Sequence, residues 1–230
     1  GTITKNGTKM SKSKGNTVAP DSFIENYGSD TFRIYLMFMG PYDEGGDWND
    51  KGIKGIYRFL NKIWRLIHLP ESNSDDKKSV QLMHHTIKIV TENLNDMKFN
   101  TAISRLMEFV NHLTQYDQIS SEAKKNLSLL LAPFAPHLSE EVWLILGQKN
   151  SIFDVSWPKY DPLKLETDEI TIVLQINGKL RASMNIQKDL DKDSILDQSK
   201  KIPNIAKYLE ESQIIKEIYV PGKLINFVVK

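Results

Sequence analysis

Residues 53–67 read IKGIYRFLNKIWRLI, and this stretch decides the fold of the larger part of the chain. Apolar side chains recur in it at steps of three and four residues, which is the period of an amphipathic α-helix with one buried face. The helix is predicted to end before Pro70, because proline cannot continue it. The residues predicted to form its buried face are Ile53, Ile56, Tyr57, Leu60, Ile63, Trp64 and Ile67.

The same period continues to about residue 147 and predicts further helices. Asn100 or Thr101 can cap one of them and Ser120 or Ser121 the next, because a short polar side chain satisfies a free N–H group at a helix start. Residues 50–157 are therefore predicted to form one helix bundle, and the fold class is mainly α.

The segment before this bundle is less regular. Residues 1–19 are polar and are predicted to be turn-like. Pro20 then opens a short helix that Gly28 closes, which is the usual placement of proline and glycine. Ser29 or Asp30 is predicted to cap the helix that follows.

The pattern changes again after the bundle. Residues 158–168 contain two prolines and are predicted to be a linker. Residues 169–230 are predicted to be a small α+β domain, because Asn177-Gly178 is a strong hairpin signal between β-rich runs. A helical stretch over 193–211 follows the hairpin.

Composition narrows the class of protein. The 230 residues carry a net charge of +1, and 40% are hydrophobic, as in a soluble globular protein. The apolar runs are too short for a membrane span, so we expect no membrane association. The absence of cysteine excludes disulfides and thiolate zinc sites and fits a reducing, cytoplasmic location. The five histidines have no ligand spacing, so we expect no metal site.

The most informative polar stretch is Lys9-Met10-Ser11-Lys12-Ser13. Its ammonium groups can neutralise phosphate oxygens, and its hydroxyls and backbone N–H groups can donate hydrogen bonds to them. Such a loop suits the polyphosphate of a nucleotide. Judged on charge alone, a solvated basic loop is the alternative.

This string resembles the KMSKS signature of the class I aminoacyl-tRNA synthetases. The resemblance implies that the loop closes over ATP, which is bound with Mg²⁺ as a substrate of the whole enzyme. Lys12 matches the lysine that stabilises charge on the phosphates, and Lys9 would assist it. Met10, Ser11 and Ser13 would complete the ATP-binding loop.

Longer strings further along the chain resemble the leucyl-tRNA synthetase family of bacterial type. The resemblance implies three parts: the KMSKS loop and the end of a catalytic domain in 1–49, a class Ia anticodon-binding-type helix bundle, and a C-terminal α+β domain. It implies tRNA(Leu) as a partner. The strings that carry it are residues 27–33, 57–66, 99–103, 131–137, 175–182 and 219–226.

Other features of that family are absent from the sequence. There is no His-x-Gly-His motif, no nucleotide-binding strand series and no editing domain. We therefore expect a C-terminal portion that is inactive alone and needs the N-terminal catalytic and editing portion, from the same chain or a separate subunit. The alternatives are a stand-alone non-catalytic tRNA-binding module, a related isoleucyl or valyl enzyme, and a structural domain without RNA binding.

Basic residues mark two candidate tRNA contacts. One is a row on the helix of residues 53–67 and just before it, opposite the apolar face, which could follow a phosphate backbone. We call it the basic stripe; a solvated face is the alternative. The other lies around the turns of the C-terminal domain. The residues are Lys51, Lys54, Arg58, Lys62 and Arg65 in the stripe, and Lys179, Arg181 and Lys223 at the turns. Trp48 and Trp64 are predicted to be packing residues.

Overall fold

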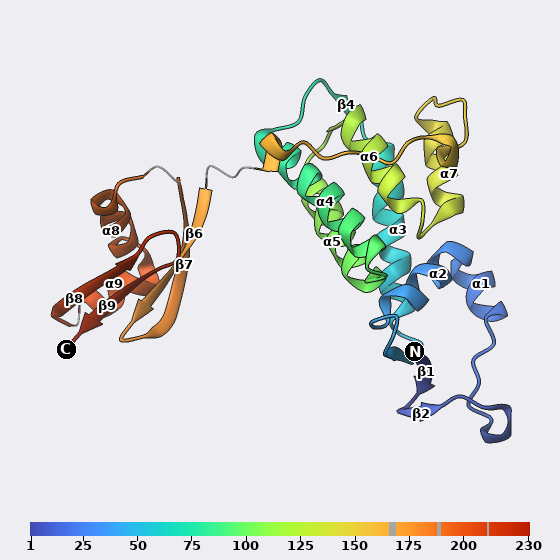
Figure 1. The fold of residues 1–230 in the computed structure, drawn as a ribbon, viewed down its shortest axis with the longest axis horizontal. Coiled ribbons are helices and arrows are strands. Elements are labelled where there is room, and N and C mark those ends of the chain that lie inside the picture. Colours follow the sequence, from blue (N-terminus) through green and yellow to red (C-terminus); the bar gives the residue numbers. More distant parts are fainter. Residues whose placement is uncertain (166–168, 188–189, 211) are drawn as a thin grey trace. The chain divides into compact units, whose positions relative to one another are not determined.

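The computed structural model divides the chain into two compact units. We call Gly1–Leu165 the helical unit and Glu166–Lys230 the terminal unit, and describe each by itself. Figure 1 shows the path of the chain through both. The residues that the structure describes are 1–165, 169–187, 190–210 and 212–230.

The helical unit is built on a bundle, as predicted. Its helices enclose a large apolar core, and α4 and α5 run side by side through most of their length (Figure 1). The bundle helices are α3 (Ile53–Ile67), α4 (Lys77–Asn95), α5 (Phe99–Leu113), α6 (Ser121–Leu131) and α7 (Pro136–Ile145). Shorter elements join or follow them: β4 (Glu71–Ser72), β5 (Ile119–Ser120), η2 (Ile152–Asp154) and η3 (Pro162–Leu165).

The buried face of α3 differs from the prediction at its edges. Tyr57 and Trp64 were predicted to be buried, but they are 42% and 38% exposed. Phe59 and Leu66 are buried instead. Because α3 packs against both α2 and α5, its buried face is turned toward these two residues.

One of the two caps predicted within the bundle is confirmed. Ser120 caps α6, and its hydroxyl accepts a hydrogen bond of 3.0 Å from the N–H of Ala123. The cap predicted at Asn100 or Thr101 is wrong. The helix α5 begins earlier, at Phe99, and Lys98 precedes it without a side-chain cap.

The first nine residues form strands that the sequence analysis missed. β1 (Thr2–Lys5) and β2 (Thr8–Lys9) make an antiparallel hairpin, and β3 (Gly45–Trp48) lies parallel to β1. Asn6 and Gly7 form the turn, with φ of 54° and 69°. An Asn-Gly pair is a hairpin signal, so the turn-like assignment of residues 1–19 was wrong here.

Two helices connect the hairpin to the bundle. α1 (Asp21–Tyr27) begins after Pro20 and ends at Gly28, as predicted, and α2 (Ser29–Phe38) follows at once. The predicted cap of α2 by Ser29 or Asp30 is wrong, because neither side chain bonds the start of this helix.

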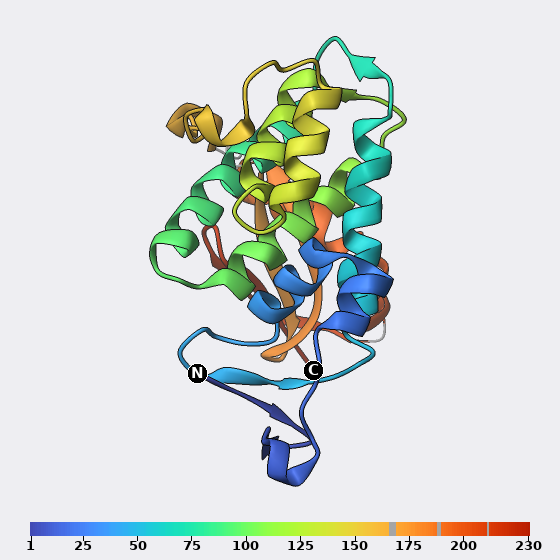
Figure 2. The same cartoon turned by 90° about the vertical axis from the view of Figure 1, so that its right-hand side faces the viewer.

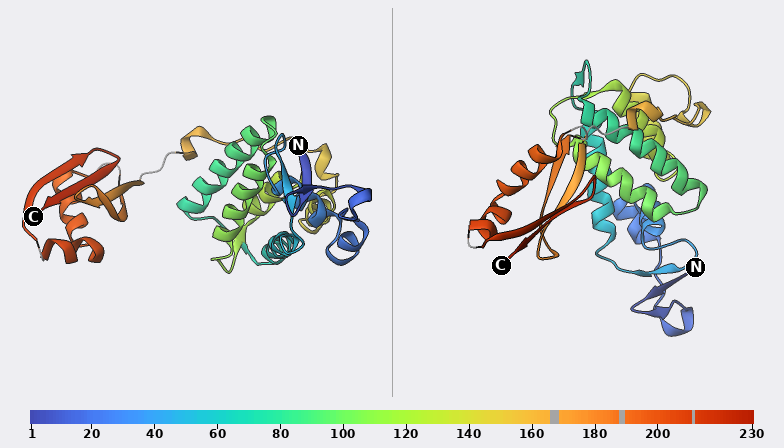
Figure 3. Two further views of the ribbon diagram at one scale, coloured as in Figure 1. Left: turned by 90° about the horizontal axis from the view of Figure 1, so that it is seen from below. Right: turned by 60° about the vertical axis from the view of Figure 1, so that its left-hand side comes forward.

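The terminal unit is a four-stranded sheet with helices on one face, as Figure 3 shows. The strand order is β7-β6-β9-β8, and the turn at Asn177 and Gly178 between β6 and β7 is confirmed. The helical stretch is confirmed except at residue 211, which lies outside the described residues. The elements are β6 (Glu169–Ile176), β7 (Lys179–Gln187), α8 (Lys192–Lys200), α9 (Pro203–Glu210), β8 (Ile214–Val220) and β9 (Leu224–Val229).

Candidate functional site

The KMSKS loop, residues 9–13, is closed by a side chain that sequence reasoning did not single out. The side-chain oxygen of Asn16 accepts a hydrogen bond of 2.8 Å from the N–H of Ser11. Its amide nitrogen donates to the carbonyl of Lys9 at 3.2 Å. Asn16 follows the loop in the chain and bonds back to its first and third residues, and only its short polar side chain near a glycine could have signalled this role.

Within this loop the polar side chains point to solvent. Lys12 begins η1 (Lys12–Lys14), a single 3-10 turn that Gly15 ends with a φ of 63°. Lys9, Lys12 and Ser13 are exposed, and the Ser11 hydroxyl lies 3.2 Å from that of Ser13. Figures 1 and 2 show the loop, in dark blue, projecting beyond the helices at the end of the β1–β2 hairpin. The arrangement presents ammonium groups and hydroxyls to a ligand from solution.

The hairpin that carries this loop is attached to the helices through β3. Asp47 accepts hydrogen bonds from the Thr4 hydroxyl at 2.6 Å and from the Gly7 N–H at 2.9 Å. The hydrogen bond from Thr4, with that from Gly7, lowers the pKa of Asp47. The next residue, Trp48, is 4% exposed and packs edge-on against Phe23 at 5.0 Å, so its predicted packing role is confirmed.

Asp30 in α2 caps a different helix from the one predicted. It is 8% exposed, and its carboxylate accepts a hydrogen bond of 2.7 Å from the N–H of Leu138, in the first turn of α7. The same carboxylate lies 2.8 Å from Nδ1 of His137. Close by, Arg33 donates to the carbonyl of Pro133 at 3.3 Å. Two strings that carried the family resemblance, residues 27–33 and 131–137, therefore contact each other.

The five basic-stripe residues are all exposed on α3 and just before it. In the described part of the chain none of them forms an ion pair, and Lys62 donates a hydrogen bond of 2.7 Å to Asn111 in α5. Between α3 and α5 lies a hollow of about 230 Å³ lined by Gly55, Arg58, Phe59, Lys62, Met107 and Asn111. A row of unpaired cations beside an open hollow can accept a polyanion.

The candidate residues of the terminal unit are less uniform. Lys179 is exposed at the start of β7, and Lys223 is exposed in the turn before β9. Arg181 stands at a β-bulge, and its guanidinium lies 4.5 Å from the centre of the Tyr208 ring in α9. A cation held over an aromatic ring is less available to a phosphate than a free one.

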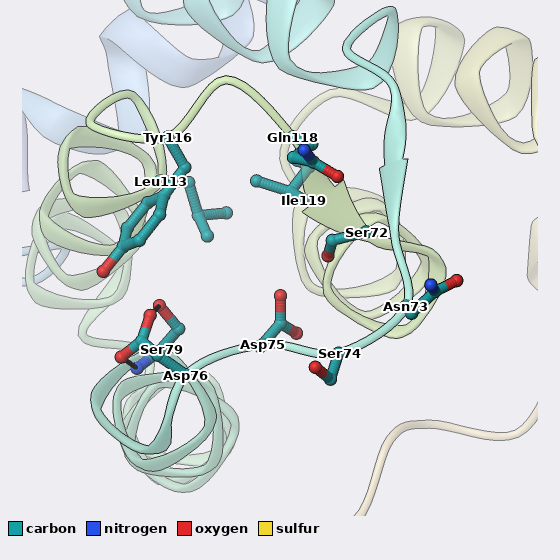
Figure 4. A pocket seen from close by; sticks show the side chains of 10 residues that line it. All are labelled: Ser72, Asn73, Ser74, Asp75, Asp76, Ser79, Leu113, Tyr116, Gln118 and Ile119. Carbon is teal, nitrogen blue, oxygen red and sulfur yellow. Dashed lines mark hydrogen bonds between the residues drawn. The ribbon is translucent and has the colours of Figure 1, made fainter.

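A polar pocket lies between the start of α4 and the loops beside it (Figure 4). Asp76 caps α4 with hydrogen bonds from the N–H groups of Lys78 and Ser79. Burial raises its pKa, but hydrogen bonds from Ser79, Tyr116 and the backbone outweigh burial and hold the pKa at about 2. Asp75 accepts from the N–H and hydroxyl of Ser120. Asp75 thus joins the segment before α4 to the cap of α6, whereas Asp76 is engaged by the start of α4 and by Tyr116.

No group of three or more potential metal-ligating side chains is found among the described residues. In the same residues, no helix is long and apolar enough to cross a membrane.

Two family models match the chain. Residues 2–48, which contain the hairpin and the KMSKS loop, match the model described as "tRNA synthetases class I (I, L, M and V)". Residues 76–196 match the model described as "Anticodon-binding domain of tRNA ligase".

Several relatives align with nearly the whole chain. The leucine–tRNA ligase of Chlorobaculum parvum is 47% identical over 96% of this chain and 28% of that protein. The leucine–tRNA ligase of Petrotoga mobilis is 42% identical over 100% of this chain and 31% of that protein. The chain therefore spans about three tenths of the length of these relatives.

A solved structure is similar over the same extent. It is the ternary complex of Agrobacterium radiobacter K84 agnB2 LeuRS with tRNA and LeuAMS. The TM-score is 0.74 and the identity 28%, and the similarity covers 100% of this chain and 33% of the other.

Proposed function

We propose a function for this chain from its family. It belongs to the family of the anticodon-binding domain of tRNA ligases, and its homologues are leucine–tRNA ligases. It supplies the KMSKS loop and the tRNA-binding part of an enzyme that attaches leucine to tRNA(Leu) with ATP, through a leucyl-adenylate. The observation that carries this proposal is the KMSKS loop itself, exposed on the hairpin and closed by Asn16.

In this proposal the loop binds the phosphates of ATP, which enters with Mg²⁺ as substrate. Lys12 begins the turn η1 and forms no ion pair in the described part of the chain, so its ammonium can neutralise negative charge that develops as pyrophosphate leaves. Lys9 assists from the other end. Met10 packs against the core, while Ser11 and Ser13 offer hydroxyls. The remaining catalytic and editing parts come from the N-terminal portion that the relatives possess.

The tRNA contacts proposed for this chain are the basic stripe and the turn residues Lys179, Arg181 and Lys223. The same proposal divides the chain into a catalytic-domain end, a helix bundle that starts at residue 50, a linker that starts at 158 and a terminal domain that starts at 169. It also includes a cytoplasmic location. Residues 166–168 of the proposed linker lie outside the described residues.

The stripe is tested by charge reversal in a binding assay with tRNA(Leu). The double variant Lys54→Glu and Arg58→Glu should weaken binding and reduce the slope of log K against log salt by about 1 for each phosphate that the protein no longer neutralises. The double variant Lys149→Glu and Lys159→Glu is the control, because these exposed residues change the net charge equally. Equal affinities and slopes in the two double variants would show that the stripe is only solvated.

A further inference from the structure

The basic stripe is bordered on one side by a row of aromatic and amide side chains. Tyr57, Asn61, Trp64 and His68 follow one another at steps of three and four residues, so they share one edge of α3. By the same spacing, Arg65 lies one turn from both Asn61 and His68. The row therefore adjoins the cations along its length.

Trp64 is exposed to a degree that packing does not explain. It is 38% exposed, whereas Trp48 and Trp143 in the same unit are 4% and 5% exposed. Its ring centre lies 4.6 Å from that of His68, and the two rings are inclined at 51°. The pair forms an open aromatic surface, which we call the Trp64 platform.

The polar side chains beside this surface are held in place by hydrogen bonds, and each has a further atom that can form another. Nδ1 of His68 is bonded to the Trp64 carbonyl at 2.8 Å, so this contact fixes the imidazole ring beside the indole. The Asn61 amide nitrogen donates to the Tyr57 carbonyl at 2.8 Å. Within the described residues, no hydrogen bond uses Nε2 of His68, the side-chain oxygen of Asn61 or the indole N–H of Trp64.

Bases that have left a helical stack are recognised by aromatic faces combined with hydrogen bonds to their edges. Neighbouring cations bind the phosphates on either side of such a base. We propose that the Trp64 platform stacks an unpaired base of the bound tRNA, while Arg65 and the rest of the basic stripe hold the adjacent phosphates. This inference rests on the proposed function, since it assumes that the stripe binds tRNA.

The test compares two substitutions that fill the site alike. Phe and Leu are both apolar and of similar size, but only Phe retains an aromatic face. The Trp64→Leu variant should raise the Kd for tRNA(Leu) about tenfold, which is the loss expected for one stacked base. The Trp64→Phe variant should stay within about threefold of the parent. Stacking releases no counterions, so the salt slope should be unchanged in both.

If the Trp64→Leu variant folds poorly, a second measurement tests the platform without it. Stacking a base on Trp64 should quench part of the parent's tryptophan emission when tRNA binds, and the Trp64→Phe variant should lack that part. Equal quenching in parent and Phe variant, or equal affinities for parent, Phe and Leu variants, would overturn the platform while leaving tRNA binding intact. A parent that does not bind tRNA at all would instead remove the proposed function and the platform with it.

Discussion

The contact between α2 and α7 predicts a measurable loss of stability when Asp30 is removed. Its carboxylate is buried and caps α7 through a partly buried hydrogen bond from the Leu138 N–H. Replacing a cap costs about 1 kcal/mol, and a buried N–H left without a partner costs about 1–3 kcal/mol. Both figures describe the same group, so we expect Asp30→Ala to lower the free energy of unfolding by about 2 kcal/mol.

Urea unfolding followed by tryptophan fluorescence measures this loss selectively. The four tryptophans, at 48, 64, 143 and 157, all lie in the helical unit, so the signal reports on that unit alone. In a thermal scan, 2 kcal/mol corresponds to a fall in Tm of about 4–8 °C for a unit of this size.

Three further variants separate the cap from other effects. Asp30→Asn should be intermediate, because the amide oxygen can still accept from Leu138. His137→Ala should cost less than about 1 kcal/mol, since this side chain is 73% exposed. Asp43→Ala is the matched control, because this aspartate is exposed and makes no hydrogen bond or ion pair within the described residues. If Asp30→Ala were no more destabilising than Asp43→Ala, the assignment of the cap would be wrong.

Three other results are expected. The pKa of Asp76 in the folded protein is about 2, below the usual 3.8. Its contribution to the free energy of unfolding is therefore present above pH 3.8 and is lost as the pH falls toward 2. After allowance for solvent screening, Asp76→Ala should cost about 1 kcal/mol in urea unfolding at pH 7 and almost nothing at pH 2. A penalty that persists at pH 2 would contradict this. Asn16→Ala should reduce leucine-dependent ATP–pyrophosphate exchange by the whole ligase about tenfold or more without changing the unfolding midpoint, because the closed loop is lost; unchanged exchange would deny the role of Asn16. Gly178→Val should destabilise the terminal unit by about 1–2 kcal/mol in far-UV circular dichroism, because φ is 77° there, and a variant as stable as the parent would refute the strained turn.

Signals that depend on neighbours in the chain were sufficient to predict much of the fold. The helix period predicted the bundle, and the pair at Asn177 and Gly178 predicted the hairpin of the terminal unit. The hairpin at Asn6 and Gly7 carried the same signal, but its strands are too short to show alternation.

Features that depend on distant partners could not be predicted. Asp30 is of a residue type that often caps its own helix. Only the packing of α7 against α2 shows that its carboxylate accepts a hydrogen bond from Leu138 instead. Trp64 fits an apolar helix face, and only the placement of α2 and α5 leaves it half exposed. The KMSKS loop was found by its string, whereas its closure by Asn16 required the folded backbone.

The central claim is that this chain supplies the KMSKS loop of a leucine–tRNA ligase. The most direct test replaces the matching part of the Chlorobaculum parvum leucine–tRNA ligase with this chain and measures leucine-dependent ATP–pyrophosphate exchange. We predict exchange by the chimera that Lys12→Ala abolishes and the loop-exit substitution Thr17→Ala leaves intact. A cooperatively folded chimera without exchange, or one in which Lys12→Ala has no effect, would contradict the claim.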